Sequence, residues 1–276
     1  MTTTIHTNPG ALVAQATLRN ITRNLDIVSK QVQTGYKVAD AKDDASTFAV
    51  AQGLRGNLAS LGAVQQGLSS AVGLAEVGLA GATAVSNLFE GIKTKLTQLA
   101  DTSITAAQRV TYTTDLKDLA TQAKDLIKQA KFNGTNLLNN TTAINFIADV
   151  TGGSISVTGV DVFTTASTFN ASIGASVTST LARTFLNSSS NTLDDFLAAT
   201  NNALSGVAGD LRAVEAQNSF TKAISDATER GLGALVDADL AKASSKLQAL
   251  QAQQQLATQA ITIANQAPSV LLALFQ

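Results

Sequence analysis

Cysteine and tryptophan are missing from the 276-residue sequence, and histidine occurs only once, at His6. Without cysteine there are no disulfides, no thiolate metal sites and no cysteine nucleophiles. A lone histidine would need unusual partners to form a metal site or a catalytic triad, so we interpret His6 as a solvent-facing or subunit-contact residue. The sequence therefore predicts a protein that is not an enzyme and that uses no metal or cofactor.

Charges and aromatic rings are scarce as well. Charged residues make up 14% of the chain and aromatic residues 4%, whereas about a quarter of a typical domain is charged. The net charge is -1 and lysine and arginine form no run, which argues against nucleic acid and anionic membranes as partners. The sequence also lacks about 18 consecutive apolar residues and the basic and apolar regions of a secretory signal. Taken alone, it indicates a cytoplasmic protein with no membrane partner.

Proline is confined to Pro9 and Pro268, one near each end, so nothing between them is obliged to break a helix. Alanine, leucine, threonine, serine, glutamine and asparagine dominate the composition, a mixture that suits long helices packed through small residues. Apolar residues recur at alternating spacings of three and four in five segments, which predicts helices that each bury a narrow stripe against partners.

The clearest stripes lie towards the two ends of the chain. The first stops at Gly35, a residue type that commonly ends helices, and Asp237 or Asp239 is suited to cap the start of the last. The first stripe places on one seam Leu18, Ile21, Leu25, Val28 and Val32. The last places on one seam Leu240, Leu247, Leu250, Ile261 and Leu271. Isolated amphipathic helices are marginal in water, so we expect both stripes to need partner helices.

Between the ends, the same spacing predicts a bundle of long helices. Asp43 and Asp44 precede a helix that runs to about Leu96. We interpret both acids as N-caps, and paired carboxylates for acid–base chemistry or for a cation are the less favoured alternative. Capping boxes at Thr105–Gln108 and Thr192–Asp195 predict the starts of two further helices.

A different period appears between Ala143 and Val157, where apolar and polar residues alternate around Gly152 and Gly153. Alternation around a glycine turn predicts a β-hairpin. The following stretch, to about Ser190, is rich in serine, threonine and asparagine, and we interpret it as a loop-like surface without helical period. The glycines at 78–81 and 152–153 lack the lysine and the strand–turn–helix order of a phosphate-binding loop.

Several segments, taken together, resemble bacterial flagellins, and the compact flagellins of alphaproteobacteria most of all. The resemblance covers residues 18–138 and 191–276. The matching segments, in the family's order and spacing, are TGYKV at 34–38, AKDDA at 41–45, FNGTNLL at 132–138, LVDADLAKAS at 235–244 and IANQAP at 263–268. The coincidence of several motifs in order makes the resemblance specific.

The resemblance implies a mainly α fold with two parts, a terminal α-helical coiled coil that forms an inner domain and an elongated helical bundle with a small β-hairpin element. The expected boundaries are residues 1–42 for the N-terminal arm, 43–140 for the first part of the bundle, 141–190 for the hairpin and surface region, 191–236 for the returning helix and 237–276 for the C-terminal arm.

The resemblance also implies the function, a structural subunit that self-assembles into the hollow flagellar filament used for swimming. The implied partners are further copies and related flagellins in a helical homopolymer, the hook–filament junction protein, the filament cap, an export chaperone and the flagellar secretion apparatus. Export through that apparatus, without a cleaved signal peptide, implies an extracellular location and would explain the missing signal.

Two sets of polar residues have open interpretations. The glutamines of the last helix are either a lining of the filament channel or a plain solvated face: Gln248, Gln251, Gln253, Gln254, Gln255 and Gln259. Related flagellins often carry O-linked sugars on outer serine and threonine, and the resemblance extends this to Thr164, Thr165, Ser167, Thr168, Ser172, Ser176, Thr178 and Ser179. The alternative for these hydroxyls is a polar surface that meets water.

Three other functions compete with a filament subunit. A hook–filament junction protein shares the terminal design, and the segment at 263–268 favours flagellin over it. A helical adaptor would form a discrete soluble oligomer instead of an open-ended polymer. An enzyme is disfavoured because the sequence offers no constellation of catalytic residues.

Overall fold

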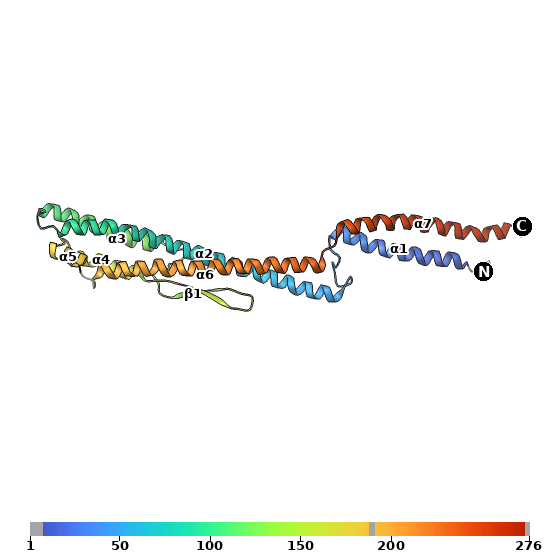
Figure 1. Ribbon diagram of the computed structural model, residues 1–276, viewed down its shortest axis with the longest axis horizontal. Helices are drawn as coiled ribbons and strands as arrows, with labels where there is room; N and C mark the ends of the chain where they lie inside the picture. The colour runs from blue at the N-terminus through green and yellow to red at the C-terminus, as the bar shows by residue number, and fades with distance from the viewer. Residues whose placement is uncertain (1–7, 188–190, 274–276) are drawn as a thin grey trace. The chain divides into compact units, whose positions relative to one another are not determined.

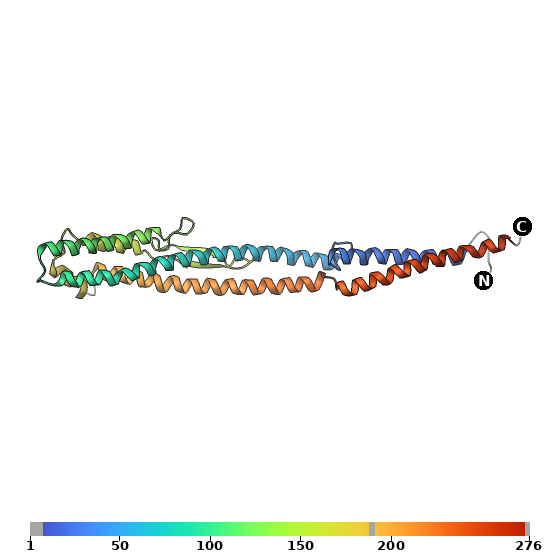
Figure 2. The same ribbon diagram turned by 90° about the horizontal axis from the view of Figure 1, so that it is seen from above.

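The structure is a computed structural model that describes residues 8–187 and 191–273, with side chains described to residue 266 (Figures 1 and 2). His6 lies outside the described residues. The chain divides into two compact units, one formed by residues up to Leu58 with those from Ala227 onward, the other by Ala59–Asp226. The secondary-structure elements are α1 (Pro9–Thr34), α2 (Ala45–Ala100), α3 (Ala106–Gln129), β1 (Ala143–Ile147), β2 (Ser154–Thr158), α4 (Val162–Ser172), α5 (Ser179–Asn187), α6 (Thr192–Val236) and α7 (Leu240–Ala273). The predicted mainly α fold with a small β element is confirmed.

Side chains define where several helices begin. The Asn8 side chain accepts a hydrogen bond from the backbone of Ala11 and precedes a proline in the first turn of α1. Helix α3 starts with the predicted capping box, in which Thr105 and Gln108 each bind the other's backbone. The capping box predicted at the start of α6 is wrong, because the side chain of Asn191 instead accepts the N–H groups of Leu193 and Asp194.

The unit formed by Ala59–Asp226 has one main apolar core, to which α2, α3, α4, α5 and α6 all contribute. Figures 1 and 2 show α4 and α5 lying beside the longer helices. Phe169 of α4 is fully buried, with its ring centroid 5.6 Å from that of Phe185 and 6.1 Å from that of Phe196. Phe89 of α2 stands 4.7 Å from Phe196. Four aromatic rings thus meet in this core, where the helices pack together.

The interpretation of the stretch up to Ser190 as loop-like surface is wrong, since α4 and α5 lie within it. The apolar residues Val162, Ala166 and Phe169 are buried at helical spacing. Threonine and serine occupy most of the positions between them, and Thr164 and Thr168 are exposed. The polar composition of this stretch therefore concealed its apolar stripe.

The predicted β-hairpin is present, with β1 antiparallel to β2 and Phe146 opposite Ile155. One face of the hairpin packs on a second apolar cluster that includes Leu68, Val207 and Val214 of α2 and α6. Two side chains of α6 also hold the strands. Asp210 accepts the N–H of Thr158 at 2.7 Å, and Gln217 donates to the carbonyl of Ala148 at 2.8 Å. These contacts give a two-stranded ribbon, which is marginal alone, the support it needs.

Helix α2 is the one helix among the described residues long and apolar enough to cross a membrane, with an 18-residue window of mean hydropathy 1.4 that is 39% buried. Length and composition are weak evidence for a span, because core helices meet the same criteria. The apolar residues of α2 supply both clusters of this unit, from Val64 to Leu99. Its hydropathy is therefore accounted for by core packing.

Close packing against α2 depends on a missing side chain at Gly81. A Cβ at this position would stand 2.6 Å from the Cβ of Ala130 and 2.9 Å from Leu138 Cδ1. The Ala130 methyl cannot swing aside, because it is fixed directly to the backbone. Gly62, on the same helix, would place a Cβ in open space.

We predict that Gly81→Ala and Gly62→Ala have effects of opposite sign. Gly62→Ala should raise the free energy of unfolding by about 0.5–1 kcal/mol, because alanine is the better helix former. Gly81→Ala should lower it by about 1–3 kcal/mol through overpacking. Thermal unfolding of the purified monomer, followed by circular dichroism, measures both. Equal stabilisation by the two substitutions would contradict the close approach at Gly81.

Candidate assembly surface

The terminal helices α1 and α7 pack against each other through a small apolar seam. Val28, Ala243 and Leu250 are buried, with exposed fractions of 2%, 7% and 7%. The residues packed around them are only partly buried: Ile21, Leu25, Val32 and Leu247. Six of the ten residues predicted for the two seams thus meet in one cluster, together with Ala243.

The other predicted seam residues lie outside this cluster. Leu18 and Ile261 are half-buried and line an open groove of about 460 Å³ between α1 and α7. The side chain of Asn8 spans the two helices there and donates to the carbonyl of Ala264 at 2.7 Å. Leu240 is 49% exposed. Leu271 belongs to α7, but its side chain lies outside the described ones.

Both terminal helices also expose large apolar side chains. On α1 these include Val13 and Leu12, of which Leu12 borders the open groove. On α7 they include Leu256 and Ile263, and the exposed fractions of these four lie between 59% and 68%. Counting one stripe per helix missed these residues, because they fall between the three-and-four positions. The sequence does contain a signal for this second surface, namely the apolar residues outside the stripe. Large apolar side chains exposed on a helix indicate that a partner covers them.

The predicted helix caps divide between two roles. Gly35 ends α1 in the left-handed conformation, with φ 75°, and its N–H binds the carbonyl of Gln31. Asp44 caps α2 by accepting the N–H groups of Ser46 and Thr47. Asp239 caps α7 by accepting the N–H of Lys242.

Asp43 and Asp237, also predicted as caps, do not serve in that role. The carboxylate of Asp43 turns back towards the segment between α1 and α2 and accepts the N–H groups of Ala39 and Asp40. Asp237 stands opposite Tyr36 in an isolated antiparallel bridge between the two connecting segments. In both pairs the acid next to the helix is the one that reaches its free N–H groups, so only one acid of each pair caps.

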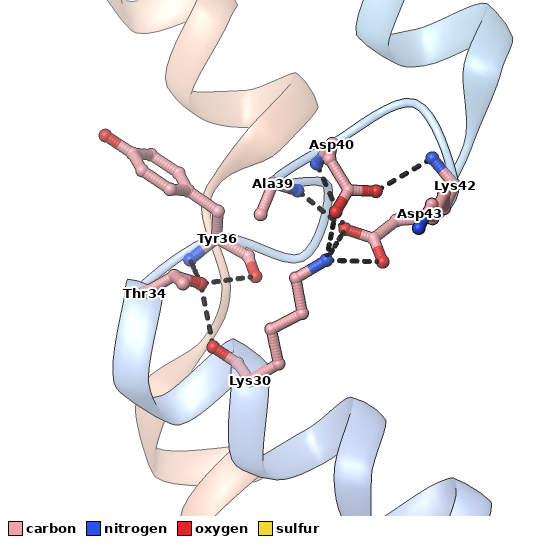
Figure 3. A network of polar contacts seen from close by, with 7 residues as sticks. All are labelled: Lys30, Thr34, Tyr36, Ala39, Asp40, Lys42 and Asp43. Carbon is pink, nitrogen blue, oxygen red and sulfur yellow. Dashed lines mark hydrogen bonds and ion pairs between the residues drawn. The ribbon is translucent and has the colours of Figure 1, made fainter.

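A polar network holds the segment between α1 and α2, as Figure 3 shows. Lys30 Nζ, on the last turns of α1, lies 2.7 Å from Asp40 Oδ2 and 2.9 Å from Asp43 Oδ2. Thr34 Oγ1 donates to the carbonyl of Lys30 and accepts the N–H of Tyr36. These bonds fix the path of the chain as it leaves α1.

Lys30 and the two carboxylates of this network favour each other's charged forms. The bond from Lys30 lowers the pKa of Asp43 below its ordinary value, and the N–H of Ala39 lowers it further. The pKa of Asp40 is lowered by Lys30 and then by the N–H of Lys42. Asp40 and then Asp43 raise the pKa of Lys30. All three groups are partly exposed, so the ion pairs themselves contribute little to stability. The hydrogen bonds from the backbone N–H groups to the carboxylates fix the conformation of the segment.

The remaining candidate residues lie on surfaces. Of the glutamines of α7, Gln254 is half-buried and the others are exposed. The hydroxyls considered for sugar attachment are exposed at Thr164, Thr168, Ser176 and Thr178. They are half-buried at Thr165, Ser167, Ser172 and Ser179. Within the described part of the chain, no group of three histidine or acidic residues is arranged to hold a metal ion.

Two family models match the chain. The bacterial flagellin N-terminal helical region matches residues 5–143, and the bacterial flagellin C-terminal helical region matches residues 191–275. Between the two matches lie β1, β2, α4 and α5, with the exception of the first residue of β1.

Curated relatives match almost end to end. Flagellin FljK of Caulobacter vibrioides is 33% identical over 99% of this chain and 98% of its own length. A flagellin of Brucella melitensis is 29% identical over 99% of both chains. A crystal structure of Bacillus cereus flagellin aligns at 14% identity with a TM-score of 0.34, over 61% of this chain and 88% of its own.

The two matching regions and the full-length relatives agree with each other and with the paired terminal helices. The chain therefore belongs to the bacterial flagellin family, and it is a structural subunit of the extracellular flagellar filament, not an enzyme.

Proposed function

We propose that this subunit enters the filament through α1 and α7, which act as the inner arms of a hollow helical homopolymer. The observation that carries the proposal is the exposure of Leu12, Val13, Leu256 and Ile263 on helices whose shared seam buries only three residues. Apolar side chains on several sides of a helix pair need more than one neighbour to cover them. Further copies of the same chain supply such neighbours at every step of a polymer.

In this proposal the arms comprise residues 1–42 and 237–276. The bundle comprises residues 43–140 and 191–236, and residues 141–190 form its hairpin and outer surface. The exposed glutamines of α7 are uncharged and polar, and they suit the lining of a channel through which unfolded subunits move. Electron microscopy of purified protein after seeding is the direct test, because discrete oligomers in place of filaments would overturn the proposal.

The finer partners follow from the family. We propose that an export chaperone carries the chain, and that the chain leaves the cell through the flagellar secretion apparatus without cleavage of a signal peptide. Outside the cell it joins a filament that starts on the hook–filament junction protein and grows beneath a filament cap. Co-purification of the chain with each of these proteins from the native host tests the partners one by one.

We predict that the helical parts of both arms, α1 and α7, are largely unfolded in the monomer and fold on assembly. The seam of α1 and α7 is too narrow to hold two amphipathic helices together by itself. Limited proteolysis of the monomer should remove the residues before Gly35 and after Asp239 and leave the bundle intact, whereas the filament should resist. Equal protection of the arms in monomer and filament would rule this out.

We predict that Leu250→Asp blocks filament formation. Leu250 is among the most buried residues of the seam, and an unpaired carboxylate there costs several kcal/mol in every subunit. The matched control is Gln253→Asp, which adds the same charge to an exposed position of α7. The amount of protein that sediments as polymer after seeding measures the effect. Normal polymer from Leu250→Asp would show that the seam is assigned wrongly.

We predict that filament protein from the native host carries O-linked sugars on the outer hydroxyls, with Thr164, Thr168, Ser176 and Thr178 the most accessible sites. Their exposure on α4 and the segment after it supports the proposal. Intact-mass spectrometry tests it, since the unmodified, uncleaved chain weighs 28.3 kDa. A single species at that mass would remove the modification and leave the filament assignment unaffected.

A further inference from the structure

The segment that precedes α2 and the segment that follows α6 are joined by backbone hydrogen bonds. One segment is residues 35–44, between α1 and α2. The other is residues 236–239, from the last residue of α6 to the start of α7, and together we call them the clasp. Lys37 N donates to the carbonyl of Val236 at 2.8 Å, and Ala238 N donates to the carbonyl of Gly35 at 2.8 Å. These two bonds flank Tyr36 and Asp237, which makes that pair a non-hydrogen-bonded antiparallel pair.

Side chains support the clasp from both sides. Val38 and Val236 are buried together with Ala51 at the start of α2, with Phe48, Leu232 and Leu235 packed around them. On the polar side, Asp43 accepts two backbone N–H groups of the clasp and also binds Lys30 of α1. Lys37 Nζ donates to the carbonyl of Ala234 on α6. The clasp therefore has its own small core and does not depend on the terminal helices alone.

Burial between α1 and α7 is greatest in the half of the seam nearer the clasp. Val28, Ala243 and Leu250, within about three turns of it, are buried, whereas Leu240 beside the clasp is 49% exposed. Farther out, Leu18 and Ile261 are only half-buried and border an open groove. The arms therefore bury their seam in the half nearer the clasp and are more loosely packed towards their far ends.

We propose that the clasp is a preformed template that starts the pairing of α1 with α7, so that the arms close from the clasp outward. The physical reason is effective concentration: two weakly attracting helices that are tied at one end pair far more readily than two free ones. Closing a loop of the length between α1 and α7 also carries an entropic cost, which the clasp has already met. In this mechanism Asp43 is a positioning residue, because it joins the last turns of α1 to the clasp.

The inference rests on the proposed role of the arms in assembly, but its first test needs no polymer. The chain has no cysteine, so Tyr36→Cys combined with Asp237→Cys introduces a single possible disulfide, at a pair whose Cα spacing suits one. The reduced and oxidised forms of this double variant have the same sequence and are the matched pair.

Hydrogen exchange on the monomer should show more protection in the oxidised form than in the reduced form. The gain should be largest around Val28 and Ala243 and should fade towards Leu18 and Ile261. Seeded elongation should then be several-fold faster for the oxidised form. Protection that is unchanged by oxidation, or that is gained first at the far ends of the arms, would overturn the template.

A second variant keeps the test decisive if the cysteine pair fails to fold. Asp43→Ala, in the otherwise natural chain, should slow seeded elongation several-fold while the thermal unfolding of the bundle stays unchanged. Asp26→Ala, which removes an exposed acid of α1, is the control for the charge. Equal elongation rates for the two variants would show that Asp43 has no positioning role. Failure of the natural chain to elongate at all would count against the proposed function and not against the exchange gradient.

Discussion

The narrowness of the seam between α1 and α7 is the constraint on which the rest of this subunit depends. Three buried residues and four partly buried ones cover only one side of two helices of 26 and 34 residues. Most of the stability of a helix in a protein comes from packing of its apolar face. Two helices with so little shared core need further helices to cover them, which is why we propose that they are completed by neighbouring subunits of the filament.

The bundle unit has the opposite character. Its helices share a continuous core in which Phe89, Phe169 and Phe196 meet, and small residues such as Gly81 let neighbouring segments approach closely. We expect such a unit to fold without neighbours, because most of its large apolar side chains are buried within it. In the proposed assembly, one chain thus combines a unit with its own core and arms that are completed by neighbouring subunits, and the clasp lies at the base of the arms.

Much of this arrangement could be predicted from periodicity and capping chemistry. The stripes on α1 and α7, the capping box of α3, the glycine that ends α1 and the hairpin all follow from rules that act within a few residues. The helix α4 was missed because serine and threonine dominate its composition while Val162, Ala166 and Phe169 carry its period. Such rules could not predict which of two neighbouring acids caps a helix either. Asp43 and Asp44 differ only in which N–H groups lie within reach of their carboxylates.

The contacts across the clasp were the least predictable, because they join residues about two hundred positions apart through backbone atoms. No side-chain pattern predicts a hydrogen bond from Lys37 N to the carbonyl of Val236. Sequence can indicate that both connecting segments are short and polar, but not that they form a bridge.

The same feature has an evolutionary consequence. A joint made from backbone N–H and carbonyl groups imposes few demands on the side chains at Tyr36 and Asp237, because almost any residue except proline supplies the same donors and acceptors. Copies of this subunit that differ at these two positions can therefore keep the same backbone bridge at the joint.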